Sequence, residues 1–126
     1  MTIKARNYGD REWSNAPVEI CAFGPKGTAP FGLYERARVR VEQGGTAMAY
    51  LGFSPYGQGE ETTFAQLVAG EFSIPVENVM IIHDDTNSTP EGRGTYGSRT
   101  TPVGGSAVYN AVQRLKEKMT NIALKV

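Results

Sequence analysis

The spacing of apolar residues changes along this chain, and the change restricts the folds that the chain can form. In residues 34–41, small apolar side chains alternate with three arginines, the pattern of a strand that buries one face. Residues 17–23, 46–53 and 79–82 are also rich in strand-forming side chains. A Gly-Gly pair at 44–45 predicts a hairpin between two of these strands. These segments are expected to form one sheet.

Two other segments have helical spacing. Residues 63–72 and 105–122 each carry one apolar stripe at intervals of three and four residues. The expected members of the two stripes are Phe64, Leu67, Val68 and Phe72, then Val108, Val112, Leu115, Met119 and Ile122. Thr62 or Thr63 can cap the first helix, with two glutamates just before it at its positive end.

The length of 126 residues suits one domain with one core. Residues 1–16 are polar and without periodicity, and are predicted to form an N-terminal arm before a domain at 17–126. The order strand, strand, strand, helix, strand, helix predicts an α+β fold. We expect a small mixed sheet with two helices packed on one face.

Composition excludes several classes of function. Thirteen basic and thirteen acidic residues balance, so we expect no nucleic acid and no membrane among the partners. Cys21 is the only cysteine, which excludes an internal disulfide, an iron–sulfur cluster and the usual zinc sites. We expect it to be a small buried residue of a strand. No apolar run approaches about 20 residues and no secretory signal is recognisable, so a cytoplasmic location is expected.

The three arginines of residues 34–41 fall on one face of the predicted strand. Such a row could contact phosphate or nucleic acid. Glu35 and Glu42 flank it, however, and favour the solvated outer face of a sheet.

Two glycine-rich loops lead into the two predicted helices. They span residues 54–63 and 94–102. Glycines in such loops let backbone N–H groups approach an anion, and a helix start adds partial positive charge. Neither loop has the spacing of a Walker or dinucleotide motif. The residues alone therefore leave two interpretations open, a site for a polar or phosphate-bearing ligand and plain turn-and-cap geometry.

Three motifs in these regions follow one another in a fixed order. They are Gly57-Gln58-Gly59-Glu60-Glu61-Thr62, His83-Asp84-Asp85-Thr86 and Gly94-Thr95-Tyr96-Gly97-Ser98-Arg99-Thr100. They resemble the Gly-Gln-Gly-His-Glu-Thr, His-Gly-Asp-Thr and Gly-Ser-Arg-Ser segments of one protein family. That family is the large subunit of the molybdenum hydroxylases, which include carbon monoxide dehydrogenase, xanthine dehydrogenase and aldehyde oxidase. The resemblance covers residues 17–123.

The resemblance implies that the two loops bind molybdopterin with its molybdenum, in its simple form or as the cytosine dinucleotide. Gly57, Gln58 and Gly59 would bind the pterin–phosphate portion, and Gly97 would pass close to the molybdenum and substrate. The other implied cofactor-binding residues are Thr95, Ser98, Arg99 and Thr100. Because the dithiolene of the cofactor supplies the metal ligands, we expect no protein metal ligand in this chain. We also expect no catalytic residue in it, because the resemblance implies that the catalytic glutamate belongs to a motif that this sequence lacks.

Two residues of these motifs differ from the family, and a third, the only histidine, has two possible roles. Glu60 stands where the family has histidine, and a carboxylate there would repel a phosphate unless it turns outward or is neutralised. Asp84 replaces a glycine of the family. His83, the only histidine, has the chemistry of a general base, whereas the resemblance implies a hydrogen-bonded structural residue.

Other family motifs do not occur in the sequence. They are the Gly-Val-Gly-Glu motif with the catalytic glutamate, the Gly-Gly-Phe-Gly loop and the Ala-Tyr-Arg segment. The resemblance thus implies a component of a split large subunit, part of an oxidoreductase and inactive alone. Its partners would be chains carrying the rest of that subunit, iron–sulfur and flavin subunits, or a second copy of itself. Two alternatives stay open, a non-catalytic remnant domain and a self-associating binding or assembly module without cofactor.

Overall fold

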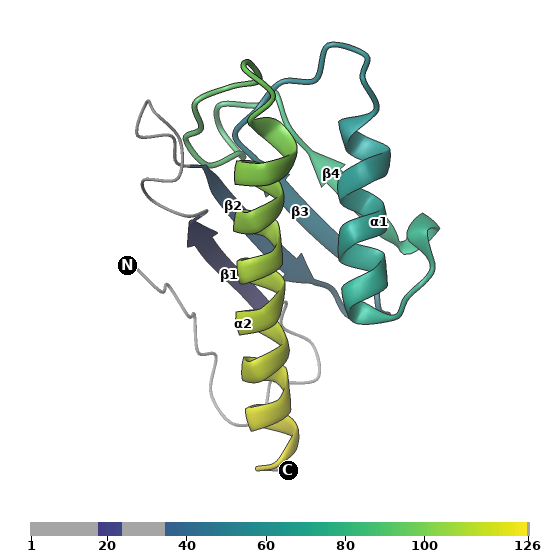
Figure 1. Ribbon diagram of the computed structural model, residues 1–126. Helices are drawn as coiled ribbons and strands as arrows, with labels where there is room; N and C mark the ends of the chain where they lie inside the picture. The colour runs from purple at the N-terminus through teal and green to yellow at the C-terminus, as the bar shows by residue number, and fades with distance from the viewer. Residues whose placement is uncertain (1–17, 24–34, 126) are drawn as a thin grey trace.

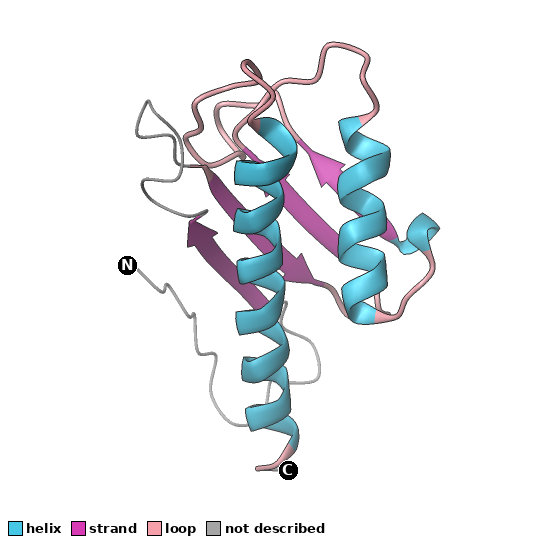
Figure 2. Cartoon of the chain, viewed as in Figure 1, coloured by secondary structure: helices cyan, strands magenta, loops and turns pink. Residues whose placement is uncertain are grey.

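The computed structural model describes residues 18–23 and 35–125, which form a four-stranded sheet with two helices on one face (Figure 1, Figure 2). The strands are β1 (Val18–Phe23), β2 (Arg36–Val41), β3 (Ala47–Leu51) and β4 (Val79–Ile82). The helices are α1 (Glu60–Phe72) and α2 (Gly105–Ala123), with a 3₁₀ turn η1 (Val76–Asn78) and a π-helical turn η2 (Thr100–Gly104). The predicted α+β fold is confirmed.

The sheet is mixed, as expected. Its strand order is β1-β2-β3-β4, with antiparallel pairing between the first three strands and parallel pairing between β3 and β4. Gly44 and Gly45, with φ angles of 99° and 86°, form the predicted hairpin turn between β2 and β3. Parallel neighbours require a crossover connection, and α1 lies in that connection.

The buried face of the sheet follows the alternation in the sequence. Ala37 and Val39 of β2 are fully buried, as are Ala47, Ala49 and Leu51 of β3. Both helices lay their apolar stripes on this face (Figure 1). Their most buried core residues are Phe64, Val68, Ala107, Val108, Ala111, Val112 and Leu115. Full burial of one of the larger aliphatic or aromatic side chains contributes roughly 1.5–3 kcal/mol.

The helix ends differ from the predictions. The predicted caps Thr62 and Thr63 are wrong, because α1 begins at Glu60 after Gly59, whose φ of 81° closes the turn without a side-chain cap. The two glutamates consequently fall inside the first turn. Met119 of the second stripe is 37% exposed, since the last turns of α2 extend beyond the sheet (Figure 1).

The outer face of the sheet is less solvated than predicted. All three arginines of β2 are half-buried. The Arg38 guanidinium carbon lies 4.1 Å from the centre of the Tyr50 ring, and this guanidinium donates to the Ser88 carbonyl. Arg36 lies 3.4 Å from a carboxylate oxygen of Glu91. Long cationic side chains cover apolar surface in this way while keeping polar partners.

Some predictions cannot be compared with the structure. The arm at 1–16, the start of the domain at residue 17 and the side chain of Cys21 lie outside the described residues. Within the part of the chain that is described, no helix is both long enough and apolar enough to cross a membrane.

Candidate functional site

The two glycine-rich loops meet at one end of the sheet. Because β3 and β4 are parallel neighbours, their carboxyl ends lie at the same edge. Residues 52–59 leave β3 there and lead into α1, and residues 83–99 leave β4 there and lead into η2 and α2 (Figure 1). Ligands of sheets with this kind of connection commonly bind beyond the carboxyl ends of the strands. The topology thus brings together the two segments that the motifs single out.

Direct backbone contact joins the two loops. A Cβ atom on Gly92 would lie 2.0 Å from the Gly52 carbonyl oxygen, and one on Gly52 would lie 2.6 Å from the Gly92 Cα. Real Cβ atoms do not approach backbone so closely. Gly52 and Gly92 lie just before the two glycine-rich loops defined from the sequence, so the contact is made by the backbone segments that lead into those loops.

A buried ion pair between Glu35 and Arg99 stabilises the second loop. Glu35 and Arg99 are 1% and 2% exposed, and Arg99 Nη1 lies 2.8 Å from Glu35 Oε2. Arg99 Nη1 also donates to the Gly94 carbonyl, and the Arg93 backbone N–H donates to Glu35 at 3.4 Å. The prediction that Glu35 flanks a solvated face is wrong, because its carboxylate is buried in contact with Arg99 and Arg93 of this loop.

An open pocket of about 340 Å³ lies between the loops. Its lining residues are Gln58, Glu60, Thr95, Tyr96, Ser98, Thr100 and Thr101. Three oxygens of these residues are buried and have no hydrogen-bond partner among the described residues, namely Glu60 Oε2, Thr95 Oγ1 and Thr100 Oγ1. Buried polar atoms in folded proteins are nearly always hydrogen-bonded. The pocket itself is open and lined by polar side chains.

Glu60 does not turn outward. It is 5% exposed, and its Oε1 accepts a hydrogen bond from Gln58 Nε2. The Oε1 of Gln58 in turn accepts from the Tyr56 backbone N–H at 2.5 Å. The carboxylate therefore fixes the orientation of the predicted ligand residue Gln58.

The remaining predicted site residues occupy different positions. Four of them line the pocket, Gln58, Thr95, Ser98 and Thr100. Gly57, Gly59 and Gly97 have positive φ angles of 93°, 81° and 57°, and a Cβ on any of them would meet nothing within 4 Å. Arg99 does not line the pocket, because its guanidinium points to Glu35 instead.

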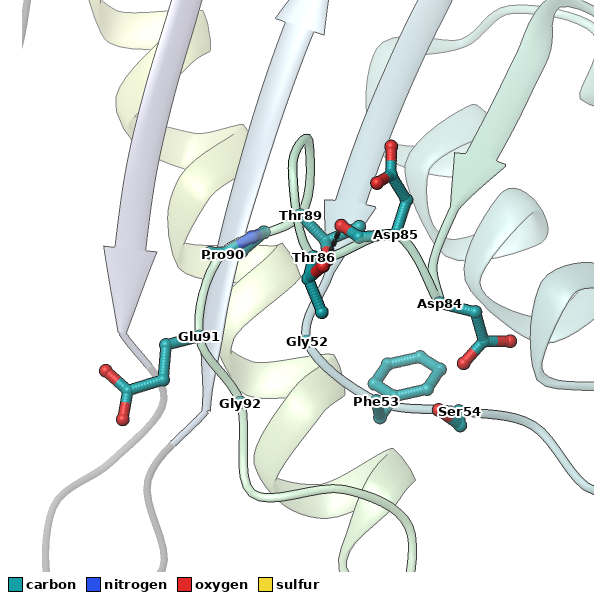
Figure 3. Close-up of a pocket in the computed structure, with 10 residues that line it drawn as sticks. All are labelled: Gly52, Phe53, Ser54, Asp84, Asp85, Thr86, Thr89, Pro90, Glu91 and Gly92. Atoms are coloured by element: carbon teal, nitrogen blue, oxygen red, sulfur yellow. Dashed lines mark hydrogen bonds between the residues drawn. The ribbon is translucent and has the colours of Figure 1, made fainter.

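A second, larger pocket of about 490 Å³ lies beside the contact between Gly52 and Gly92 (Figure 3). Asp84, Asp85 and Glu91 line it, together with backbone of both loops. Figure 3 shows Asp84 facing Ser54, and their hydrogen bond, together with that to His83, lowers the pKa of the Asp84 carboxyl. Three carboxylates do not favour a phosphate-bearing ligand. We therefore place the candidate site in the smaller pocket.

His83 joins the end of β4 to the first turn of α1. Its Nε2 lies 2.5 Å from Glu61 Oε1 and its Nδ1 lies 2.7 Å from Asp84 Oδ2. Asp84 has a φ of 60°, the left-handed conformation that glycine adopts freely and aspartate tolerates. That conformation explains the glycine of the family motif. With both ring nitrogens engaged, His83 has the structural environment that the resemblance implies.

We expect this histidine to make stability depend on pH. Burial alone lowers the pKa of His83, but its hydrogen bonds to Glu61 and Asp84 and their charges raise it overall above 6.5. A raised folded-state pKa stabilises the fold fully below the unfolded value, and this stabilisation is lost as pH rises through the folded pKa.

Urea unfolding of the wild-type chain from pH 6 to pH 9 should show a decline in the free energy of unfolding that His83→Gln lacks. The control is Gln113→Ala, which removes a part-buried hydrogen bond to Glu71 without altering a titrating imidazole. An identical pH profile for wild type and His83→Gln would contradict the assignment.

No group of three or more histidine, cysteine, aspartate or glutamate side chains in the described residues is arranged to hold a metal ion.

Residues 14–126 match the model of a family described as the molybdopterin cofactor-binding domain. The carbon monoxide dehydrogenase large chain of Afipia carboxidovorans is 38% identical over 109 residues, which are 84% of this chain and 14% of that protein. The 6-hydroxypseudooxynicotine dehydrogenase complex subunit gamma of Paenarthrobacter nicotinovorans is 40% identical over 130 residues, with 96% and 16% covered.

A solved structure, the reconstituted CO dehydrogenase from Oligotropha carboxidovorans, matches with a TM-score of 0.68 and 34% sequence identity. The match covers 81% of this chain and 13% of that chain. The chain thus spans only a small part of the length of the proteins that it resembles.

Proposed function

The chain belongs to the molybdopterin cofactor-binding domain family of carbon monoxide dehydrogenase and xanthine dehydrogenase large subunits, and on this premise we propose that its two glycine-rich loops form part of a molybdenum cofactor site. The oxidoreductase activity would belong to a larger assembly, because the chain covers 14% of the carbon monoxide dehydrogenase large chain. Molybdopterin would be bound in its simple form or as the cytosine dinucleotide.

The observation that supports this proposal most directly is the polar lining of the pocket between the two loops. Thr95 Oγ1, Thr100 Oγ1 and Glu60 Oε2 all belong to residues that line one pocket. The pocket is lined by an amide, a phenol, a carboxylate and four hydroxyl side chains, so the residues present fit a cofactor rich in donors and acceptors.

The proposed roles follow from where each residue lies. Gln58, Thr95, Ser98 and Thr100 would hydrogen-bond the cofactor, and Arg99 would act as a positioning residue through its ion pair with Glu35. The cofactor, when bound, supplies the redox-active molybdenum together with the dithiolene that coordinates it.

Other polypeptide segments would complete the site. The relatives are named as a large chain and as a subunit of a complex. We propose that segments carrying the rest of a large subunit enclose the cofactor, with iron–sulfur and flavin subunits as further partners. A ligand of this size needs enclosure on several sides, whereas the pocket described here is open.

A tagged pull-down from the native host tests the proposal. Partners are identified by mass spectrometry, and molybdenum is determined on the same sample. Near-stoichiometric molybdenum with chains of the same family supports the proposal. Recovery of the chain alone and without metal would leave a remnant domain, and a defined homo-oligomer without metal would indicate an assembly module.

Thr100→Val separates a binding role from a structural role. The substitution removes a hydroxyl that is buried and has no hydrogen-bond partner among the described residues, so the free energy of unfolding of the chain should stay within about 1 kcal/mol of wild type. The lost hydrogen bond should weaken retention of molybdenum cofactor by the assembled complex about tenfold. Thr120→Val, on the far part of α2, is the matched control for loss of a threonine hydroxyl. Unchanged molybdenum content in Thr100→Val would remove Thr100 from the site.

A further inference from the structure

Glu35 lies outside the three motifs of the sequence, yet its buried carboxylate contacts the second glycine-rich loop. It is 1% exposed and directly precedes β2. Its Oε2 lies 2.8 Å from Arg99 Nη1 within the loop and 3.4 Å from the Arg93 backbone nitrogen just before the loop. A Cβ on Gly92 would lie 2.2 Å from its Oε1, so this oxygen packs against the Gly92 backbone. One carboxylate therefore contacts both the segment that leads into the loop and the loop itself.

The Arg99 guanidinium extends this contact to two other residues of the loop. Arg99 Nη1 donates to the Gly94 carbonyl as well as to Glu35. The guanidinium carbon lies 5.4 Å from the centre of the Tyr96 ring, within the range of a cation–π interaction. Tyr96 lines the candidate pocket, whereas Glu35 and Arg99 do not. The ion pair thus affects the pocket only through the loop.

These contacts require the shape of the guanidinium as well as its charge. Its N–H groups point in fixed directions from one plane, whereas a lysine ammonium is a compact charge on a flexible stem. Arg99→Lys would therefore keep a positive charge opposite Glu35, but would not hold Gly94 and Tyr96 at fixed positions. The charge pair and the loop contacts can be separated by this substitution.

We propose that Glu35 is a positioning residue for the candidate pocket, which fixes the Arg99 guanidinium and, through it, the Gly94 carbonyl and the Tyr96 ring. The inference rests on the proposed function, because the pocket residues need one arrangement only if the pocket holds a ligand. Glu35 and Arg99 act through the loop and do not touch that ligand. Loss of the guanidinium geometry should therefore loosen the loop while the domain stays folded.

Amide hydrogen exchange of the purified full chain tests the inference without cofactor. In the wild type the Arg99 N–H donates to the Tyr96 carbonyl at 3.2 Å, and the Val103 N–H donates to the Arg99 carbonyl at 2.9 Å. Arg99→Lys should speed exchange at these two amides about tenfold relative to the amides of β3, because local opening of the loop exposes them without unfolding the sheet. Glu35→Asp, which keeps the charge and shortens the reach to Arg99, should have the same local effect.

Arg40→Lys is the matched control. Arg40 lies near the hairpin end of β2, and its Nε lies 2.5 Å from a carboxylate oxygen of Glu42. Exchange at residues 99 and 103 should keep its wild-type rate in this variant. In the assembled complex, Arg99→Lys should lower the retention of molybdenum cofactor about tenfold, and Arg40→Lys should leave it unchanged.

Three results would overturn the inference. The first is wild-type exchange at residues 99 and 103 in both Arg99→Lys and Glu35→Asp. The second is an equal increase in β3, because the ion pair would then stabilise the whole domain without positioning the loop. The third is unchanged molybdenum retention in Arg99→Lys despite faster local exchange.

The outcome for the proposed function is separate. Wild-type exchange in both variants, with molybdenum present in the wild-type complex, would remove the inference and leave the proposed function standing. Faster local exchange in the variants of a chain whose wild-type complex contains no molybdenum would leave Glu35 as a positioning residue of the loop and remove the proposed function.

Discussion

Replacing Arg99 with Met should lower the free energy of unfolding by about 3–5 kcal/mol, because the substitution leaves Glu35 as a buried charge without its guanidinium partner. The two side chains are almost fully buried, so solvent cannot screen the charge that remains. Methionine fills most of the space of the arginine stem, so the loss reflects charge more than volume. Urea unfolding followed by circular dichroism at neutral pH measures it.

Two further variants decide whether the ion pair is the cause. Adding Glu35→Met to Arg99→Met removes both charges and should recover much of the lost stability. Glu91→Gln breaks an exposed pair with Arg36 and should change the free energy of unfolding by less than about 1 kcal/mol. If Arg99→Met proved as mild as Glu91→Gln, the buried ion pair would not anchor the loop.

Gly92→Ala should lower the free energy of unfolding by about 3 kcal/mol or more. The new Cβ would lie 2.0 Å from the Gly52 carbonyl oxygen and 2.2 Å from Glu35 Oε1, so backbone of one loop must move. Overpacking of this kind costs roughly 1–3 kcal/mol where side chains can adjust, and backbone adjusts less readily. The chemical denaturation midpoint reports the loss.

Gly70→Ala is the matched control for Gly92→Ala. Gly70 lies in α1, and a Cβ there would meet nothing within 4 Å. Alanine is preferred over glycine in helices by about 0.5–1 kcal/mol, so this variant should be slightly more stable than wild type. Similar midpoints for Gly92→Ala and Gly70→Ala would show that the two loops are not in the contact described.

The periodicity of the sequence was sufficient to predict the four strands and the two α-helices of the described residues. Alternation in residues 34–41 gave β2 with Ala37 and Val39 buried, and the helical stripes gave α1 and α2. Element ends were less accurate. A cap search looks for threonine or serine, but α1 starts from the left-handed conformation of Gly59. The turn η2 was not predicted, because Pro102 and two following glycines are poor signals for a helical turn.

The candidate site was predictable in its residues and not in its geometry. The motifs named Gln58, Thr95, Ser98 and Thr100, which line one pocket. The burial of Glu35 left no local signal, because a glutamate just before a strand usually contacts solvent and its partner Arg99 is 64 residues away. The orientation of Glu60 depends on where α1 begins, so an error of three residues in the helix start changed its expected environment.

The contact of Gly52 with Gly92 and the ion pair of Arg99 with Glu35 determine when the two loops become ordered. Both are made entirely within this chain, so the relative position of the two loops is set when the domain folds. Ordering a flexible loop when a ligand binds lowers the affinity, and loops that are already ordered avoid that loss. Under the proposed function, partners that enclose the site would contribute closure alone, and the order in which ligand and partners bind would not affect the arrangement of these two loops.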